Sequence, residues 1–165
     1  METRIEDLLH DDEPAILDEV APSIERMEHY HRDGAEATRQ RVEALYRQVA
    51  RAVRARDLDD LLAHAARVAR ERFEAGFDLA EVQAAFSMIE EAIARRALSR
   101  LPHAELAWGL GLVSTALAHA KGELGRTYAA LAPRAYAPGV DLTSLFKRTP
   151  ARRRSRTADE LVYPV

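Results

Sequence analysis

Histidine and carboxylate side chains at helical spacing are the residues of this chain whose types could bind a metal. Glu28 and His31 have the Glu-x-x-His spacing that carboxylate-bridged di-iron bundles use, and Asp7 and His10 repeat it more loosely. Such a site needs two of these motifs and two more inward-facing glutamates on other helices. The apolar faces of the later helices carry no carboxylate. We therefore predict no metal site, and a di-iron oxidoreductase is the second alternative function.

Two other histidines, His64 and His119, flank the apolar faces of two different predicted helices. A histidine in such a position can ligate haem iron in a globin-like pocket. A haem-binding or other ligand-binding sensor is therefore the first alternative function. The simpler interpretation is that both are boundary residues between core and surface, and we predict no cofactor.

Covalent catalysis has no support in the sequence. The chain has no cysteine, and Ser87 lies in an apolar segment without an evident histidine or aspartate partner. No Walker A, G-x-S-x-G or H-E-x-x-H sequence is present. Gly109 and Gly111 form a Gly-x-Gly, but no strand precedes it and no third glycine follows at the required spacing. We predict that the protein is not an enzyme.

The carboxylate pair Asp78 and Glu81 is explained by helix capping. Gly76 is the natural left-handed end of one helix, and the Asp-x-x-Glu spacing that follows is that of a capping box at the start of the next. The pair is therefore predicted to satisfy backbone N–H groups at a helix start. A catalytic carboxylate pair is the weaker interpretation.

The elements that carry these residues are predicted to be helices throughout. The chain has 165 residues, of which 47% are hydrophobic and only 6% aromatic, and a core of Ala, Leu, Val and Ile favours helices. We predict one all-α antiparallel bundle over residues 1–136, with about five longer helices and a short N-terminal helix near residues 2–10. Helices adjacent in sequence are expected to be adjacent in space because their connections are short. One helix is expected to run from Pro14 to the break at Asp33-Gly34, with a single apolar face of Leu17, Val20, Ile24, Met27 and His31.

The last helix is predicted to start at Pro102 and to carry two parallel stripes. One is apolar and includes Leu117 and Leu124, whereas the other consists of small residues. Four interior glycines would cost about 3–4 kcal/mol relative to alanine, so close approach of another helix, from this chain or a second subunit, is expected to compensate. A kink is the alternative. The small-residue face comprises Ala107, Gly111, Ser114, Ala118, Gly122 and Gly125, and continues to Ala129.

Charge divides the chain into two parts. Residues 1–140 hold 24 acidic and 18 basic side chains, a net charge of −6, whereas residues 141–165 hold 3 and 6, a net charge of +3. Residues 137–165 are predicted to be a disordered basic tail. The simple interpretation is a solvated segment, and the functional interpretations are binding to an acidic protein partner, nucleic acid or anionic lipid. Ser155 follows three arginines and is a candidate phosphorylation site. The basic residues of the tail are Lys147, Arg148, Arg152, Arg153, Arg154 and Arg156.

The N-terminal stretch METRIEDLLHDDEP is acidic, unlike a secretion signal, and no apolar run approaches the roughly 20 residues of a membrane span. A cytoplasmic protein is expected.

Residues 61–98 resemble the RsbRD-type N-terminal helical domain of RsbT co-antagonist proteins and other bacterial regulators. In that pattern a helix ends in arginines and an aromatic residue, a glycine follows, and the next helix carries an Ala-aromatic pair within a branched apolar stripe. The matching residues are Arg70, Arg72, Gly76, Phe77, Leu79, Val82, Ala85, Phe86 and Ile93. The resemblance extends over about residues 14–132 and implies a sensory or protein-interaction domain without catalytic residues. Such domains usually precede an output domain, so here the output is expected to be a separate protein.

The function predicted from the sequence is therefore that of a non-enzymatic regulatory helical domain. It would act through protein–protein interaction as a homodimer. The small-residue face of the last helix is the predicted contact surface, and the basic tail is a second one.

Overall fold

The computed structural model describes residues 3–136, and these form seven helices. The predicted all-α fold is confirmed. The elements are α1 (Ile5–Asp11), α2 (Glu13–Glu25), α3 (Glu28–Asp33), α4 (Ala35–Ala55), α5 (Asp59–Glu74), α6 (Leu79–Arg100) and α7 (His103–Tyr136).

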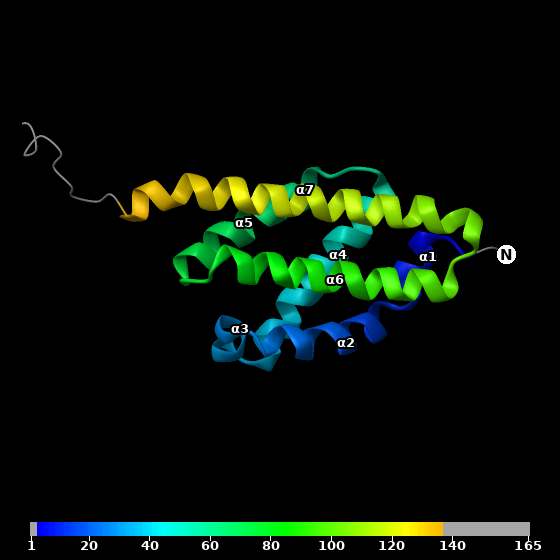
Figure 1. Cartoon of the computed structure of the whole chain (residues 1–165), viewed down its shortest axis with the longest axis horizontal. Coiled ribbons are helices and arrows are strands. Elements are labelled where there is room, and N and C mark those ends of the chain that lie inside the picture. Colours follow the sequence, from blue (N-terminus) through cyan, green and yellow to red (C-terminus); the bar gives the residue numbers. More distant parts are fainter. Residues whose placement is uncertain (1–2, 137–165) are drawn as a thin grey trace, which may run out of the picture.

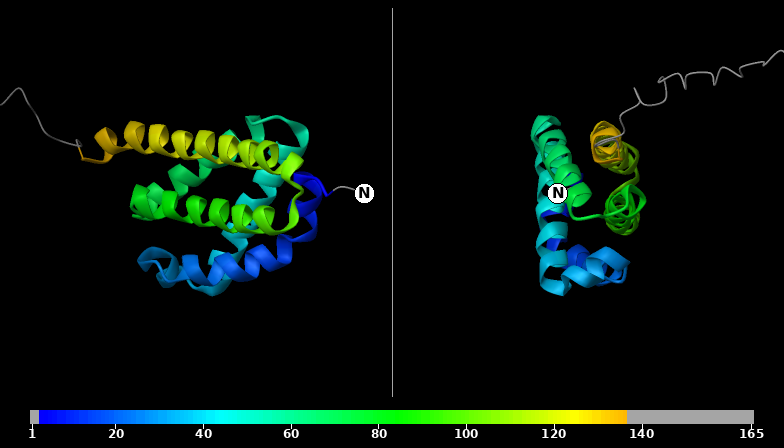
Figure 2. Two further views of the ribbon diagram at one scale, coloured as in Figure 1. Left: turned by 45° about the vertical axis from the view of Figure 1, so that its right-hand side comes forward. Right: turned by 90° about the vertical axis from the view of Figure 1, so that its left-hand side faces the viewer.

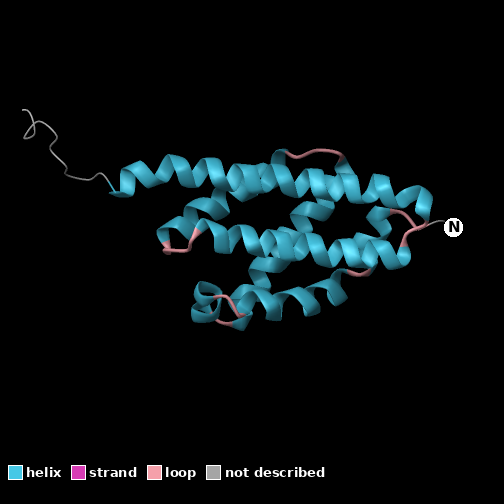
Figure 3. Cartoon of the chain, in the orientation of Figure 1, coloured by secondary structure: helices cyan, strands magenta, loops and turns pink. Residues whose placement is uncertain are grey.

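The helices pack in two layers (Figure 2). Helices α2, α6 and α7 run side by side in one layer, and α4 and α5 cross behind them in the other (Figure 1). Short connections join the helices (Figure 3). Helix α5 packs chiefly on α7 and α4, whereas α6 packs on α7 and α2. The expectation that sequence neighbours are spatial neighbours is therefore wrong for α5 and α6, because their connection carries the chain from one layer to the other.

Two glycines end helices as the sequence predicted. Gly34 and Gly76 adopt φ angles of +92° and +81°, which are costly for residues with a Cβ. Each therefore allows a sharp change of chain direction between two helices.

The single helix expected from Pro14 to Asp33 is instead two helices. Helix α2 ends at Glu25, and Met27 is extended before α3 begins. The break shifts the helical phase, so that Tyr30 enters the core with 4% of its surface exposed. The His31 side chain is 75% exposed and its Nδ1 lies 3.3 Å from Glu25 Oε1, so its assignment to an apolar face was wrong.

The capping box predicted at α6 does not form. Asp78 is the residue before the helix, but its side chain makes no capping hydrogen bond. Glu81 instead accepts a hydrogen bond of 2.9 Å from the backbone N–H of His29, and its other oxygen lies 2.6 Å from His29 Nδ1. The Glu81 carboxylate thus binds a residue 52 positions away in sequence and does not cap its own helix, although the local spacing predicts that it would. Glu81 therefore ties α6 to α3.

The compensating close approach predicted for α7 occurs at one glycine only. The apolar stripe is buried, with Leu117 and Leu124 fully enclosed. A Cβ added to Gly109 would lie 3.0 Å from Ile5 Cβ, so α1 packs directly on the backbone of α7 there. A Cβ at Gly111 would meet nothing within 4 Å. Within the described residues the small-residue face thus lies open rather than under another helix of this chain.

Among residues 3–136, no helix combines the length and apolar character that crossing a lipid bilayer requires. The basic residues predicted as a contact surface and the candidate Ser155 fall in residues 137–165, outside the described part of the chain.

Candidate functional site

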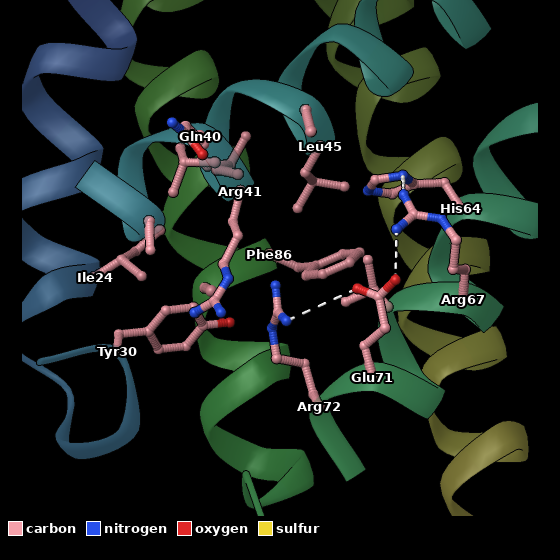
Figure 4. Close-up of a pocket in the computed structure, with 16 residues that line it drawn as sticks. Ile24, Tyr30, Gln40, Arg41, Leu45, His64, Arg67, Glu71, Arg72 and Phe86 are labelled. Atoms are coloured by element: carbon pink, nitrogen blue, oxygen red, sulfur yellow. Dashed lines mark hydrogen bonds and ion pairs between the residues drawn. The ribbon is translucent and has the colours of Figure 1, made fainter. Parts of the chain in front are cut away.

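A cavity of about 340 Å³ lies where α5 and α6 diverge against α4 (Figure 4). Ile24 of α2 and Tyr30 of α3 close one end. Residues at its rim, such as Gln40 and Glu71, are exposed, whereas the floor is buried. The volume falls in the range of cavities that bind small molecules.

The floor of the cavity is apolar. Leu45 of α4, Val68 of α5 and Phe86 of α6 converge on it, and each is at most 9% exposed. These residues belong to the faces that hold the two layers together. The cavity is therefore an interruption in the core rather than a surface dent.

Arg72 brings a positive charge into this apolar space. It continues the α5 stripe of Leu61, Ala65 and Val68 at helical spacing, and only 6% of its surface is exposed. Its Nε is buried without a hydrogen-bond partner. Its nearest carboxylate, Glu71, lies 4.0 Å from Nη1, at the limit of an ion pair. A buried guanidinium is normally paired, so Arg72 is incompletely satisfied by the residues around it.

Phe77 packs against Arg41 and Arg72, which form the cationic end of the cavity. The guanidinium carbons of Arg72 and Arg41 lie 5.4 and 5.8 Å from its ring centroid, within cation–π range. The rings of His29 and Tyr30 pack on it with centroids 5.0 Å away. This cluster joins α3, α4 and α5 through one ring.

The other two arginines that line the cavity have close carboxylate partners. Arg41 Nη1 lies 2.7 Å from Asp33 Oδ2, and Arg67 Nη1 lies 2.8 Å from Glu71 Oε1. Among the arginines that line the cavity, Arg72 alone lacks a carboxylate at hydrogen-bond distance.

His64 takes part in the cavity as a neutral acceptor. Its Nδ1 lies 2.9 Å from Arg67 Nη2, and a guanidinium has only donors. The neutral ring therefore carries its proton on Nε2. Burial, reinforced by the charge of Arg67, lowers the pKa of His64.

Burial also shifts the pKa values of the groups at the cationic end. It lowers the pKa of Arg72, and repulsion from Arg41 adds to this effect. It raises the pKa of Tyr30, although the nearby charge of Arg72 opposes the shift. A negative charge placed between the two guanidinium groups would favour both charged arginines, whereas it would further disfavour a tyrosinate. Tyr30 is thus a neutral hydroxyl there, and the arginines are the anion-attracting groups.

The two histidines considered as haem ligands lie in different surroundings. His64 lines the cavity, but His119 is exposed on α7. In residues 3–136 no three histidine, aspartate or glutamate side chains group together as metal ligands.

One polar pair was not anticipated from the sequence. Lys121 Nζ lies 3.4 Å from Ser87 Oγ, which brings together two residue types that form catalytic dyads in some hydrolases. The same ammonium lies 2.9 Å from Glu90 Oε2. Lys121 thus links α7 to Ser87 and Glu90 of α6.

The exposed face of α7 borders a second hollow. A largely apolar groove of about 470 Å³ lies between α7, the end of α4 and the connection to α5. Ala107 and Gly111 of the small-residue face line it, together with Trp108, which is 61% exposed. Among the described residues, Trp108 and Leu98 are the large hydrophobic side chains that stand exposed. The rest of the small-residue face is exposed or partly exposed: Ser114, Ala118, Gly122, Gly125 and Ala129.

The sequence pattern identified the edge of the cavity but not its charge. His64 was a candidate, whereas Arg41, Arg67 and Tyr30 were missed. Arg72 was noted only as part of a family-like pattern. The available signal was its position, because a charged residue on the buried stripe of α5 must face the interior.

No family model, curated protein or solved structure matches this chain.

Proposed function

We propose that this chain is a non-enzymatic regulatory domain that acts by binding protein, with a second copy of itself as its first partner. The observation that carries the proposal is the exposed Trp108, which lies beside an apolar groove and the small-residue face of α7. Tryptophan is the residue type most enriched at the energetic centres of protein interfaces. A contiguous apolar patch of this kind is costly to leave in water.

The geometry suits a symmetric contact. Glycine and alanine along α7 allow a second helix to approach its backbone closely, and Trp108 of each copy could enter the groove of the other. A two-fold axis makes such an interface self-complementary. The resemblance of residues 61–98 to RsbRD-type domains also favours an interaction role. A cytoplasmic location and a second contact through the basic residues of 147–156 belong to the same proposal.

The test is the mass of the full-length protein in solution. We expect a dimer, and we expect the double variant Gly111→Leu, Gly122→Leu to be monomeric because two isobutyl groups block close approach. Ala130→Leu is the matched control, since Ala130 is exposed on α7 but lies off the small-residue face. Native mass spectrometry and sedimentation velocity report the mass, and circular dichroism reports the fold.

Two outcomes would contradict the proposal. One is a wild-type protein that stays monomeric at concentrations well above the dissociation constants of ordinary homodimers. The other is a double variant that keeps both the mass and the thermal stability of the wild type. Trp108→Ala adds an independent variant, because it trims the groove without adding bulk to a helix.

A further inference from the structure

The cavity between α4, α5 and α6 carries an inference that does not depend on dimerisation. We propose that it binds a small organic carboxylate, with the carboxylate on Arg72 and an apolar body against Phe86 and Val68. The sequence predicted a ligand sensor only as an alternative built on histidine and haem. The chemistry of the cavity is that of anion recognition by a buried arginine.

The first step in the argument is that Arg72 is incompletely satisfied. It is 6% exposed, its Nε has no hydrogen-bond partner, and its nearest carboxylate oxygen is 4.0 Å away. An uncompensated charge in the interior is strongly unfavourable. An arginine fork offers paired donors that match the two oxygens of a carboxylate.

The second step is the charge of the ligand. Asp33 and Glu71 lie within 2.8 Å of Arg41 and Arg67, which leaves one guanidinium lining the cavity without a close counter-ion. A single negative charge balances it. A dianion such as phosphate would bring a second charge toward Glu71, whose carboxylate also lines the cavity.

The third step is the body of the ligand. Opposite the arginines the lining is aliphatic and aromatic, and the volume is about 340 Å³. Figure 4 shows Phe86 behind the space between Arg72 and His64. Inorganic anions would leave this apolar surface unfilled, whereas an aromatic or branched carboxylate would cover it. The exposed rim at Gln40, Ala44 and Glu71 provides access.

The experiment is a titration of the full-length protein by calorimetry and thermal melting at constant ionic strength. The probes are benzoate, its neutral analogue benzamide, 3-methylbutanoate and inorganic phosphate, with chloride as the background anion. We expect benzoate or 3-methylbutanoate to bind at one site per chain and to raise the melting temperature. Benzamide and phosphate are expected to bind at least about tenfold more weakly.

The decisive variant is Arg72→Met, which keeps the length of the side chain and removes its charge. We expect affinity to fall at least about tenfold while the unliganded protein melts at the same temperature or higher, since a buried unpaired charge is removed. Arg72→Lys keeps the charge without the fork and is expected to bind with intermediate affinity. Arg70→Met is the matched control, because Arg70 is exposed on the same helix.

Four results would overturn the inference. Binding of phosphate in preference to both carboxylates would assign the site to inorganic oxyanions. Equal binding of benzamide and benzoate would remove the role of charge. No carboxylate binding, or binding unchanged in Arg72→Met, would remove the site. The mass of the protein, measured separately, reports on the dimer and is independent of each of these results.

Discussion

Single residues in this protein show how a long-range contact displaces a local preference. Glu81 has the spacing of a helix cap, yet it binds His29 on another helix. Arg72 has the spacing of a core residue, and its charged side chain is buried. In both cases the position along the helix was readable from the sequence. The partner of Glu81 was not, because it lies on a segment whose placement depends on the whole fold.

His64 makes a prediction about pH. Its pKa in the folded protein lies below the ordinary value of about 6.5, so the unfolded chain takes up a proton first as pH falls. The stability contributed by neutral His64 is complete above that value and is lost as pH falls through it. We expect the melting temperature to fall less in His64→Asn than in the wild type between about pH 7.5 and pH 5.5, because asparagine can accept from Arg67 without titrating.

The control for this prediction is His119→Asn, since His119 is exposed on α7. Its pH dependence should match that of the wild type. Parallel curves for the wild type and His64→Asn would show that the His64 ring does not titrate differently in the two states.

At the scale of helices, the sequence predicted which segments are helical and where the helices end better than it predicted how the helices pack. The left-handed glycines at 34 and 76 mark breaks by a local rule, and the structure has them there. The break at Met27 has no glycine and was missed. The divergence of α5 and α6 was also missed, because helical periodicity gives the buried face of each helix but not the helix that covers it. The cavity exists because of that divergence and was therefore beyond prediction from periodicity.

The contact of α1 with α7 gives a prediction at this scale. Gly109→Ala would place a Cβ 3.0 Å from Ile5 Cβ, which is fixed to the α1 backbone and cannot rotate away. We expect a net loss of about 1 kcal/mol in the free energy of unfolding, because overpacking costs more than the helix preference of alanine returns. Denaturant unfolding with a constant slope measures this change.

Gly125→Ala is the matched control on the same helix. Its nearest contact would be Gln83 Nε2 at 3.9 Å, an ordinary distance to a flexible side chain. It should stabilise the protein by up to about 1 kcal/mol. If both variants gain stability equally, α1 does not pack closely enough on α7 at Gly109 to exclude a Cβ.

At the scale of the whole molecule, two hollows with different chemistry lie between the layers of helices. The anion-attracting cavity opens between α4, α5 and α6, and the apolar groove lies beside α7 at the end of α4. Helix α4 lines both, with Arg41 and Leu45 at one and Ala52 and Val53 at the other. A ligand that shifts α4 would therefore alter both surfaces.

The position of Trp108 has a practical consequence. It is the only tryptophan of the chain, and it stands at the rim of the α7 groove. Intrinsic fluorescence therefore reports on this one place without a label. We expect emission to move to longer wavelength and quenching by iodide to increase as the protein is diluted, and the Gly111→Leu, Gly122→Leu variant to give the diluted spectrum at every concentration. A spectrum independent of concentration in the wild type would mean that the indole stays in water. Trp108 thus provides an intrinsic optical test of the proposed dimer.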